Sequence, residues 1–220
     1  MQELLYFDRD LAVLVKPVGL ISEDGAAGES VIPAAAAALA AAGEHETALY
    51  PIHRLDRGVG GVMVYARTPA AAAGLSRQIA ARQLHKEYLA VVQGCPNEEG
   101  AVLRDLLFWD RAKNKSFVVK RQRGGVKDAE LEYSLLEALP ELSLLRVILH
   151  TGRTHQIRVQ FSSRAMPLVG DVKYGSRYRD CALALWSHAL GFRHPATGEA
   201  MSFSAMPEAV FPWNGFEYFK

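Results

Sequence analysis

The order of apolar and polar positions predicts a strand pair and a helix at the start of the chain. Leu4–Phe7 and Leu11–Lys16 are mainly apolar, and the polar residues 8–10 between them have the composition of a turn. The alanine-rich segment 31–42 ends at Gly43, which is typical of a helix that stops at a glycine. We therefore expect two short neighbouring strands followed by one helix.

A second set of elements is expected around the glycine-rich turn at residues 58–61. The apolar segment 62–67 follows that turn and predicts a strand. Pro69 stands in the first turn of the next predicted helix, 68–82, where its missing N–H leaves no hydrogen bond unmade. The apolar, β-branched segment 86–94 predicts a buried strand.

Most of the residues from 101 to 152 have the pattern of strands. In 129–138 leucine and tyrosine alternate with glutamate and serine, and 142–150 is a long apolar segment. Thr154 has the chemistry of a helix N-cap, so we expect a helix at 155–164 directly after the second of these strands.

The last third of the chain predicts a strand at 183–190 and a hairpin that turns through 194–198 into a strand at 201–204. No repeat of fixed period and no long linker interrupts the sequence. We therefore expect residues 1–220 to form a single domain of the α+β class with much antiparallel sheet.

The composition narrows the class of protein. The chain has 220 residues, of which 50% are hydrophobic and 22% charged, which excludes a disordered, collagen-like or disulfide-rich protein. Cys95 and Cys181 lie far apart and form no metal-binding pattern, which indicates a reduced cytoplasm and no metal. Neither a signal segment nor an apolar run of about 18 residues occurs, so we expect no membrane partner.

Charge is distributed unevenly, although the formal net charge is only +1. Residues 104–127 hold eight basic and two acidic side chains, and residues 146–179 hold seven basic side chains and one acidic one. Residues 1–50 hold eight acidic and two basic side chains. Two basic stretches on an otherwise acidic protein fit one basic face that binds an anionic polymer, but they fit ordinary solvated surfaces equally well.

Three short segments concentrate charged and polar groups in an apolar context. In 51–57 (PIHRLDR) two arginines flank Asp56 and favour its ionised form. Tyr88, at the start of a predicted buried strand, offers a flat ring and a phenol. In 150–158 (HTGRTHQIR) a strand meets the N-terminus of a predicted helix, which favours an anion. Each segment alone also fits ordinary structure: an ion pair, a core tyrosine, a capped helix.

Taken together, the motifs resemble those of the RluA-type pseudouridine synthases. Four strings occur in the order of that family: PIHRLDR at 51–57, KEYLAVVQG at 86–94, TGRTHQIRV at 151–159 and LVGDVKYG at 168–175. The string HPATGE at 194–199 is similar to part of the closing strands of the family. The resemblance covers nearly the whole chain.

The resemblance implies an enzyme that isomerises uridine in RNA to its C5-glycoside and needs no cofactor. It implies a mixed, largely antiparallel sheet with flanking helices and a central catalytic cleft. Asp56 matches the catalytic aspartate of the family, Tyr88 the active-site tyrosine that stacks on the uracil, and Arg158 the arginine that pairs with the aspartate.

The resemblance also implies residues that bind the substrate. Arg54 matches the residue that is inserted where the target nucleotide leaves the stack, and Ile157 matches an apolar residue that lines the base pocket. We expect Arg153 and His155 to bind substrate as well. The expected partner is ribosomal (23S) or transfer RNA, and we expect a cytoplasmic monomer. We expect the chain to lack the N-terminal S4-like RNA-binding module of several members, so that its own basic segments flank the cleft and bind phosphates.

The sequence departs from the family pattern after Asp56. Val59-Gly60-Gly61 replaces a usual Thr-Ser-Gly, which removes two hydroxyls and adds a glycine that we expect to make the turn more flexible. This departure leaves open a non-catalytic RNA-binding or RNA-folding factor on the same fold. A hydrolase with Asp56 as nucleophile is a third hypothesis, although no second carboxylate stands at the spacing that such chemistry needs.

Overall fold

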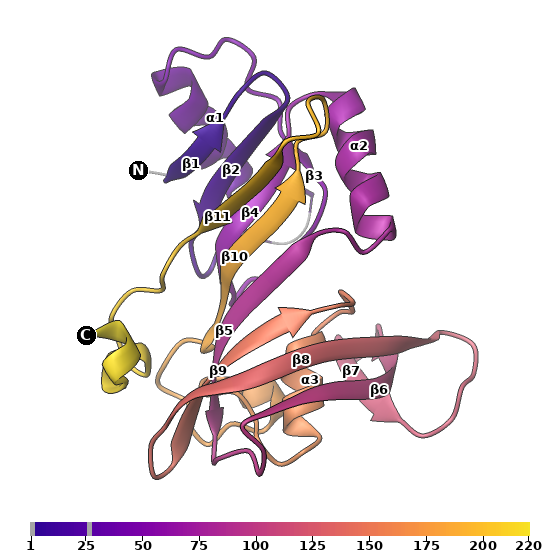
Figure 1. Cartoon of the computed structure of the whole chain (residues 1–220), viewed down its shortest axis with the longest axis vertical. Coiled ribbons are helices and arrows are strands. Elements are labelled where there is room, and N and C mark those ends of the chain that lie inside the picture. Colours follow the sequence, from indigo (N-terminus) through magenta and orange to yellow (C-terminus); the bar gives the residue numbers. More distant parts are fainter. Residues whose placement is uncertain (1–2, 26–27) are drawn as a thin grey trace. The chain divides into compact units, whose positions relative to one another are not determined.

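The computed structural model describes residues 3–25 and 28–220 and divides them into two units, whose elements are drawn in Figure 1. Unit 1 contains the residues up to Lys86 together with Trp186–Pro207, and unit 2 contains Glu87–Leu185 and Glu208–Lys220. Two of the three boundaries fall inside strands, β5 (His85–Gln93) and β10 (Leu185–Arg193), and the third lies between Pro207 and Glu208. The single domain expected over residues 1–220 stays a prediction.

Unit 1 is built on strands in the order β1, β2, β4 and β10, with β3 on β4 and β11 on β10. The bounds are Leu4–Phe7 for β1, Leu11–Lys16 for β2, Tyr50–Pro51 for β3, Gly60–Ala66 for β4 and Ala200–Ser204 for β11. All pairs are antiparallel except β4 and β10, which run parallel. The first two strands have the bounds predicted from their apolar pattern.

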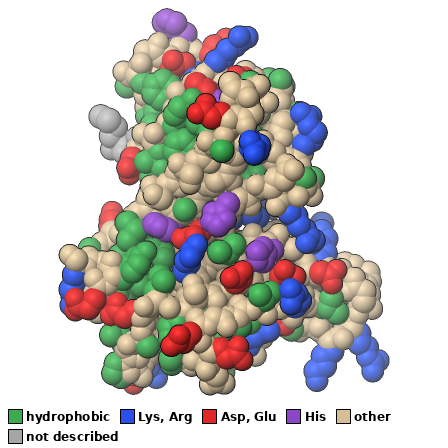
Figure 2. All heavy atoms as spheres, in the orientation of Figure 1, with side chains coloured by type: hydrophobic (Ala, Val, Ile, Leu, Met, Phe, Trp, Pro, Cys, Tyr) green, Lys and Arg blue, Asp and Glu red, His purple; other side chains and the backbone are tan. Residues whose placement is uncertain are grey.

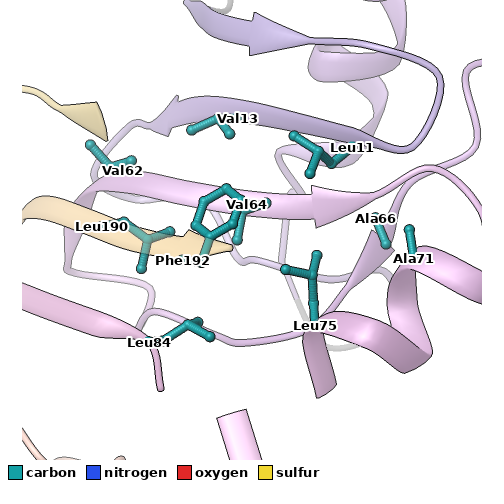
Figure 3. Packing of buried hydrophobic residues seen from close by; sticks show 10 residues of the cluster. All are labelled: Leu11, Val13, Val62, Val64, Ala66, Ala71, Leu75, Leu84, Leu190 and Phe192. Carbon is teal, nitrogen blue, oxygen red and sulfur yellow. The ribbon is translucent and has the colours of Figure 1, made fainter. Parts of the chain in front are cut away.

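The helices of unit 1 are α1 (Ile32–Ala41) and α2 (Pro69–Ala80). Thr68 caps α2, because its hydroxyl accepts a hydrogen bond of 3.2 Å from the Ala71 N–H. Leu75 of α2 packs against β4 and β10 in the buried cluster of Figure 3, in which Val64 and Phe192 point to the same region. Burial of each large apolar side chain in this cluster contributes about 1.5–3 kcal/mol.

Unit 2 contains an antiparallel sheet in the order β5, β9, β8, β6 and β7. The bounds are Gly100–Asp110 for β6, Lys115–Val119 for β7, Val126–Ala138 for β8 and Leu142–Leu149 for β9. The helix α3 (Gln156–Ser162) packs Val159 against Leu107, Ala129 and Tyr174. The 3₁₀ helices are Val172–Tyr174 (η1), Trp213–Gly215 (η2) and Glu217–Phe219 (η3).

The α+β class and its largely antiparallel sheet are confirmed, and two local predictions are wrong. Thr154 is not the N-cap of α3, because the helix begins at Gln156 and His155 is its N-cap. The φ angle of His155 is 54°, a left-handed conformation that histidine adopts more readily than most residues. Gly60 and Gly61 do not belong to a flexible turn, because both are buried residues of β4.

Candidate active site

Asp56 lies in unit 1 in the loop that joins β3 to β4. A 2.9 Å hydrogen bond from the Val59 N–H to the Asp56 carbonyl closes a tight turn directly after it. The side chain is half-buried, so it is both supported by protein and accessible to a ligand. The predicted catalytic carboxylate therefore lies at the first position of a turn, next to the buried strand β4.

Two pairs of hydrogen bonds fix the backbone on both sides of Asp56. The Ser22 hydroxyl accepts from the Leu55 N–H and donates to the Leu55 carbonyl, both at 3.0 Å. The Gly19 N–H donates to the Arg57 carbonyl, and Arg57 Nε donates to the Gly19 carbonyl, both at 2.8 Å. The segment after β2 thus holds the residue before Asp56 and the residue after it, which limits how far the carboxylate can move.

Lys16, at the end of β2, is fully buried. Its ammonium donates to the carbonyls of Pro17 and Leu20 at 2.9 and 2.7 Å. Burial lowers the pKa of Lys16 to about 8, while the negative charge of Asp56 acts in the opposite direction. At neutral pH the ammonium is still charged, so a buried cation interacts with the predicted catalytic carboxylate. Sequence analysis missed Lys16, whose only signal was a charge at the end of an apolar strand.

His53 and Arg54 precede Asp56 and differ in their environment. His53 Nε2 accepts a 3.2 Å hydrogen bond from the Val64 N–H. Burial, and to a lesser extent the charge of Lys86, lowers the pKa of His53 to about 4, so its ring is neutral at pH 7. The Arg54 side chain is 68% exposed, and its Nη1 lies 2.8 Å from Glu23 Oε1. An exposed ion pair of this kind contributes about 0–1 kcal/mol, so a ligand can displace it.

The first two residues of β4 must be small because β10 lies directly against them. A Cβ on Gly60 would lie 2.3 Å from Cζ3 of Trp186, and a Cβ on Gly61 would lie 2.2 Å from the Ser187 carbonyl oxygen. Gly61 also has a φ angle of 119°, which disfavours other residues. The indole N–H of Trp186 donates to the Ala205 carbonyl at 2.8 Å. The glycines after Asp56 therefore permit close packing, contrary to the flexibility expected from the sequence.

The other predicted residues lie in unit 2. Tyr88 is a buried residue of β5, in register with Val147 of β9. Ile157 and Arg158 are buried in α3. Arg158 makes two hydrogen bonds to Asp171, with Nε 2.7 Å from Oδ2 and Nη2 2.8 Å from Oδ1.

Arg153 and His155 are both anchored to other parts of unit 2. Arg153 Nε donates to the Asp128 carbonyl at 2.8 Å, and the Arg153 N–H donates to Gln156 Oε1 at 3.0 Å. His155 Nδ1 lies 3.0 Å from the Tyr174 hydroxyl, and its ring is edge-on to Trp109 at a centroid distance of 5.4 Å. The Arg153 N–H, which belongs to the anion site expected at the start of α3, therefore already has Gln156 as its acceptor. The helix α3 is also short, with seven residues.

The structure therefore collects the predicted residues into two groups. Arg54 and Asp56 lie in unit 1 with Lys16. The other predicted residues lie in unit 2, and they are Tyr88, Arg153, His155, Ile157 and Arg158. The pairing of Arg158 with Asp56 and the central cleft stay predictions.

The described residues contain neither a cluster of metal ligands nor a helix that could span a membrane. Within 3–25 and 28–220, no group of three or more His, Cys, Asp and Glu side chains is arranged to hold a metal ion. In the same residues, no helix has the length and hydropathy needed to cross a membrane.

Comparison with known proteins gives matches along the chain. Residues 10–163 match the family model described as RNA pseudouridylate synthase. An uncharacterized RNA pseudouridine synthase of Aquifex aeolicus is 32% identical over 231 residues, which cover 96% of this chain and 72% of the relative. The ribosomal large subunit pseudouridine synthase D of Zymomonas mobilis is 37% identical over 168 residues, and that match covers 71% of this chain and 52% of the relative.

The fold has solved counterparts too. The structure titled human RNA pseudouridylate synthase domain containing 4 superposes with a TM-score of 0.77 at 23% identity, over 94% of this chain and 89% of that one. The structure titled human RNA pseudouridylate synthase domain containing 1 has a TM-score of 0.74 at 22% identity. Because the family model spans most of the sequence and carries the motif around Asp56, the chain belongs to the RNA pseudouridylate synthase family, with the RluA-type motifs identified in its sequence.

Proposed function

We propose that this chain converts specific uridines of ribosomal (23S) or transfer RNA to pseudouridine, with Asp56 as the catalytic residue. The observation that supports this most is the loop of Asp56, whose backbone is held on both sides by the Ser22 and Gly19 hydrogen bonds. Relatives whose printed names are ribosomal large subunit pseudouridine synthase D and C favour ribosomal RNA among the two targets.

The reaction exchanges one glycosidic bond for another. The C1′–N1 bond of the uridine breaks, the uracil rotates, and a C1′–C5 bond forms. C5 then loses its proton to a general base, and N1 gains a proton, so the product is an isomer of the substrate. Asp56 serves as nucleophile at C1′ or as electrostatic partner of the positive charge that develops on the ribose. The charge of Asp56 raises the pKa of Lys16 against the effect of burial, so the Lys16 ammonium is the buried cation that interacts with this carboxylate.

The remaining residues act on the flipped nucleotide. Extruding a base from RNA costs a few kcal/mol, and the exposed side chain of Arg54 fills the vacated space. Tyr88 stacks on the uracil and, together with Asp56, is a candidate base for the C5 proton. Ile157 lines the base pocket, and Arg158 pairs with Asp56.

Within the basic stretch 104–127 of unit 2, residues 111–127 are the better candidate for binding RNA phosphates, because Arg104 is ion-paired with Glu130. Arg146, Arg158, Arg164 and Arg177 of the other stretch each form an ion pair with a carboxylate. In contrast, the cations of 111–127 form no ion pair among the described residues, apart from a 3.9 Å contact of Lys113 with Asp110. Figure 2 shows Lys and Arg side chains that project from this part of the surface. Arg153 and His155 are further candidates for binding the substrate.

The test is the substitution Asp56→Asn, which keeps the size of the side chain and removes its charge. RNA labelled with tritium at C5 of uridine releases tritium when pseudouridine forms, so release measures the proposed reaction directly. We expect the wild-type protein to release tritium at a few mapped sites and the variant to lose at least about 10²–10³-fold of the rate. Equal release by both proteins would refute the role of Asp56. Growth of the deletion strain restored by Asp56→Asn would favour the non-catalytic RNA-folding factor instead.

A further inference from the structure

Arg158 and Asp171 form a buried ion pair in which the carboxylate lies along one edge of the guanidinium. The two hydrogen bonds measure 2.7 and 2.8 Å, and the side chains are 11% and 1% exposed. Two parallel charge-assisted bonds define the plane and direction of a guanidinium, which one bond to a point charge does not. The orientation of Arg158 is therefore set by Asp171.

The ring of Tyr174 limits the same guanidinium from its face. Arg158 Cζ lies 5.1 Å from the ring centroid. The ring is itself fixed, because its hydroxyl accepts from the Ser116 N–H at 2.8 Å and lies 3.0 Å from His155 Nδ1. An edge contact and a face contact together leave the guanidinium little rotational freedom.

The backbone of Asp171 is also held. Its carbonyl accepts from the N–H groups of Tyr174 and Ser176, both at 3.0 Å, and its own N–H donates to the Leu168 carbonyl at 3.1 Å. A buried ion pair is a poor source of stability, since the loss of hydration offsets most of the attraction. Such a rigid pair is better explained by a need for a fixed arginine.

We infer that Asp171 is a positioning residue that orients Arg158 for the reaction. Asp171 binds Nε and Nη2 of Arg158, and because a guanidinium is planar these two bonds also fix the direction in which the N–H groups of Nη1 point. This inference rests on the proposed function, in which Arg158 pairs with Asp56. The Asp171 side chain is only 1% exposed, so it acts through Arg158 and not directly on the substrate.

The chain contains a matched control near the same helix. Arg164, just after α3, binds Asp105 with Nη1 2.8 Å from Oδ2 and Nη2 3.3 Å from Oδ1. This second carboxylate–guanidinium pair has no assigned part in the reaction. Asp105→Asn therefore reproduces the loss of an internal ion pair without disturbing Arg158.

The experiment compares Asp171→Asn, Asp105→Asn and the wild-type protein by tritium release from uridine-labelled total RNA of a deletion strain. We expect Asp171→Asn to lower kcat by about 10–100-fold with KM and RNA affinity within threefold, because only the geometry of a bound group changes. Asp105→Asn should keep kcat within threefold of wild type. In an Arg158→Met background, Asp171→Asn should cause no further loss, which a merely structural role does not predict.

A folded Asp171→Asn protein with the kcat of the Asp105→Asn protein would overturn the inference. If Asp171→Asn does not fold, Asp171→Glu decides, because it keeps the charge and moves the carboxylate by one methylene. The same loss of kcat is then expected, and wild-type kcat would overturn the inference. Failure of the proposed function itself has another signature, since the wild-type protein would then release no tritium at all.

Discussion

Two side chains of unit 1, Lys16 and His53, have pKa values that burial lowers well below their ordinary values. Lys16 is a buried cation whose pKa is lowered to about 8 by burial, with Asp56 acting against that shift. His53 is a neutral acceptor for the Val64 N–H, with a pKa lowered to about 4. Both side chains keep a protonation state at neutral pH that suits their hydrogen bonds. Acid protonates the His53 ring, so we expect the loop that carries His53 to be sensitive to low pH.

His53 predicts a specific pH dependence of stability. Its pKa is about 4 in the folded protein and about 6.5 when unfolded, so the unfolded chain binds more protons between these values. Stability from this group is complete above about pH 6.5 and is lost as the pH falls towards 4, by at most about 1.4 kcal/mol per pH unit. In His53→Gln, whose amide oxygen can still accept from Val64, urea unfolding should show a flatter dependence over this window. An unchanged slope would contradict the role of His53.

The element that shapes the site most is the start of β4, where two glycines lie against β10. The space of a Gly60 side chain is taken mainly by the side chain of Trp186, with the Lys16 carbonyl oxygen at 3.0 Å, whereas the space of a Gly61 side chain is taken by the backbone of Ser187. The two glycines therefore differ in what could replace them. A serine at position 60, as in the usual family turn, would need a smaller neighbour than tryptophan.

This difference predicts a double-mutant result. Gly60→Ala should destabilise the protein by about 1–3 kcal/mol because its Cβ meets the indole. In a Trp186→Leu background the same change should cost at least about 1 kcal/mol less. Gly61→Ala should stay costly in both backgrounds, since its Cβ meets main-chain atoms at a φ of 119°. Thermal unfolding of the six proteins gives the coupling, and equal costs for Gly60→Ala in both backgrounds would contradict the packing argument.

At the scale of the whole molecule, the near-zero net charge hides a division between paired and unpaired cations. Both basic stretches lie in unit 2, but the arginines of 146–179 are largely neutralised by carboxylates. The cations of 111–127 are mostly exposed. A nucleic acid would therefore gain most of its electrostatic binding energy from the cations of 111–127, because carboxylates of the protein do not already compensate the charges of these side chains.

The expected measurement is the salt dependence of RNA binding. Lys120→Gln with Arg121→Gln removes two charges that have no ion-pair partner within 3–25 and 28–220, whereas Arg104→Gln with Arg177→Gln removes two charges that are paired with glutamates. The slope of log K against log salt should fall by about 1–2 for the first pair and by less than about 0.5 for the second. Equal slopes for the two double variants would show that pairing does not decide which cations bind RNA.

Much of the architecture followed from local pattern. The bounds of β1 and β2, the position of Pro69 in the first turn of α2 and the alternation of β8 follow from periodicity and from helix-start chemistry, which act within a few residues. The family followed from short strings such as that around Asp56. The cap of α3 was predicted wrongly at Thr154, because the left-handed His155 is stabilised by contacts with Tyr174 and Trp109 that lie elsewhere in the sequence.

The sequence by itself determined the α+β class, the family and the candidate residues. The class follows from the local pattern of apolar and polar residues, and the family and the candidate residues follow from short sequence motifs. Only the tertiary structure decided which side chains surround them. Lys16 beside Asp56, Trp186 against Gly60, and Asp171 on Arg158 are neighbours only after folding. It also separated the paired cations from the unpaired ones. The physical reason is that burial, charge and hydrogen bonding depend on distances in space, and chain order sets those distances only over a few residues.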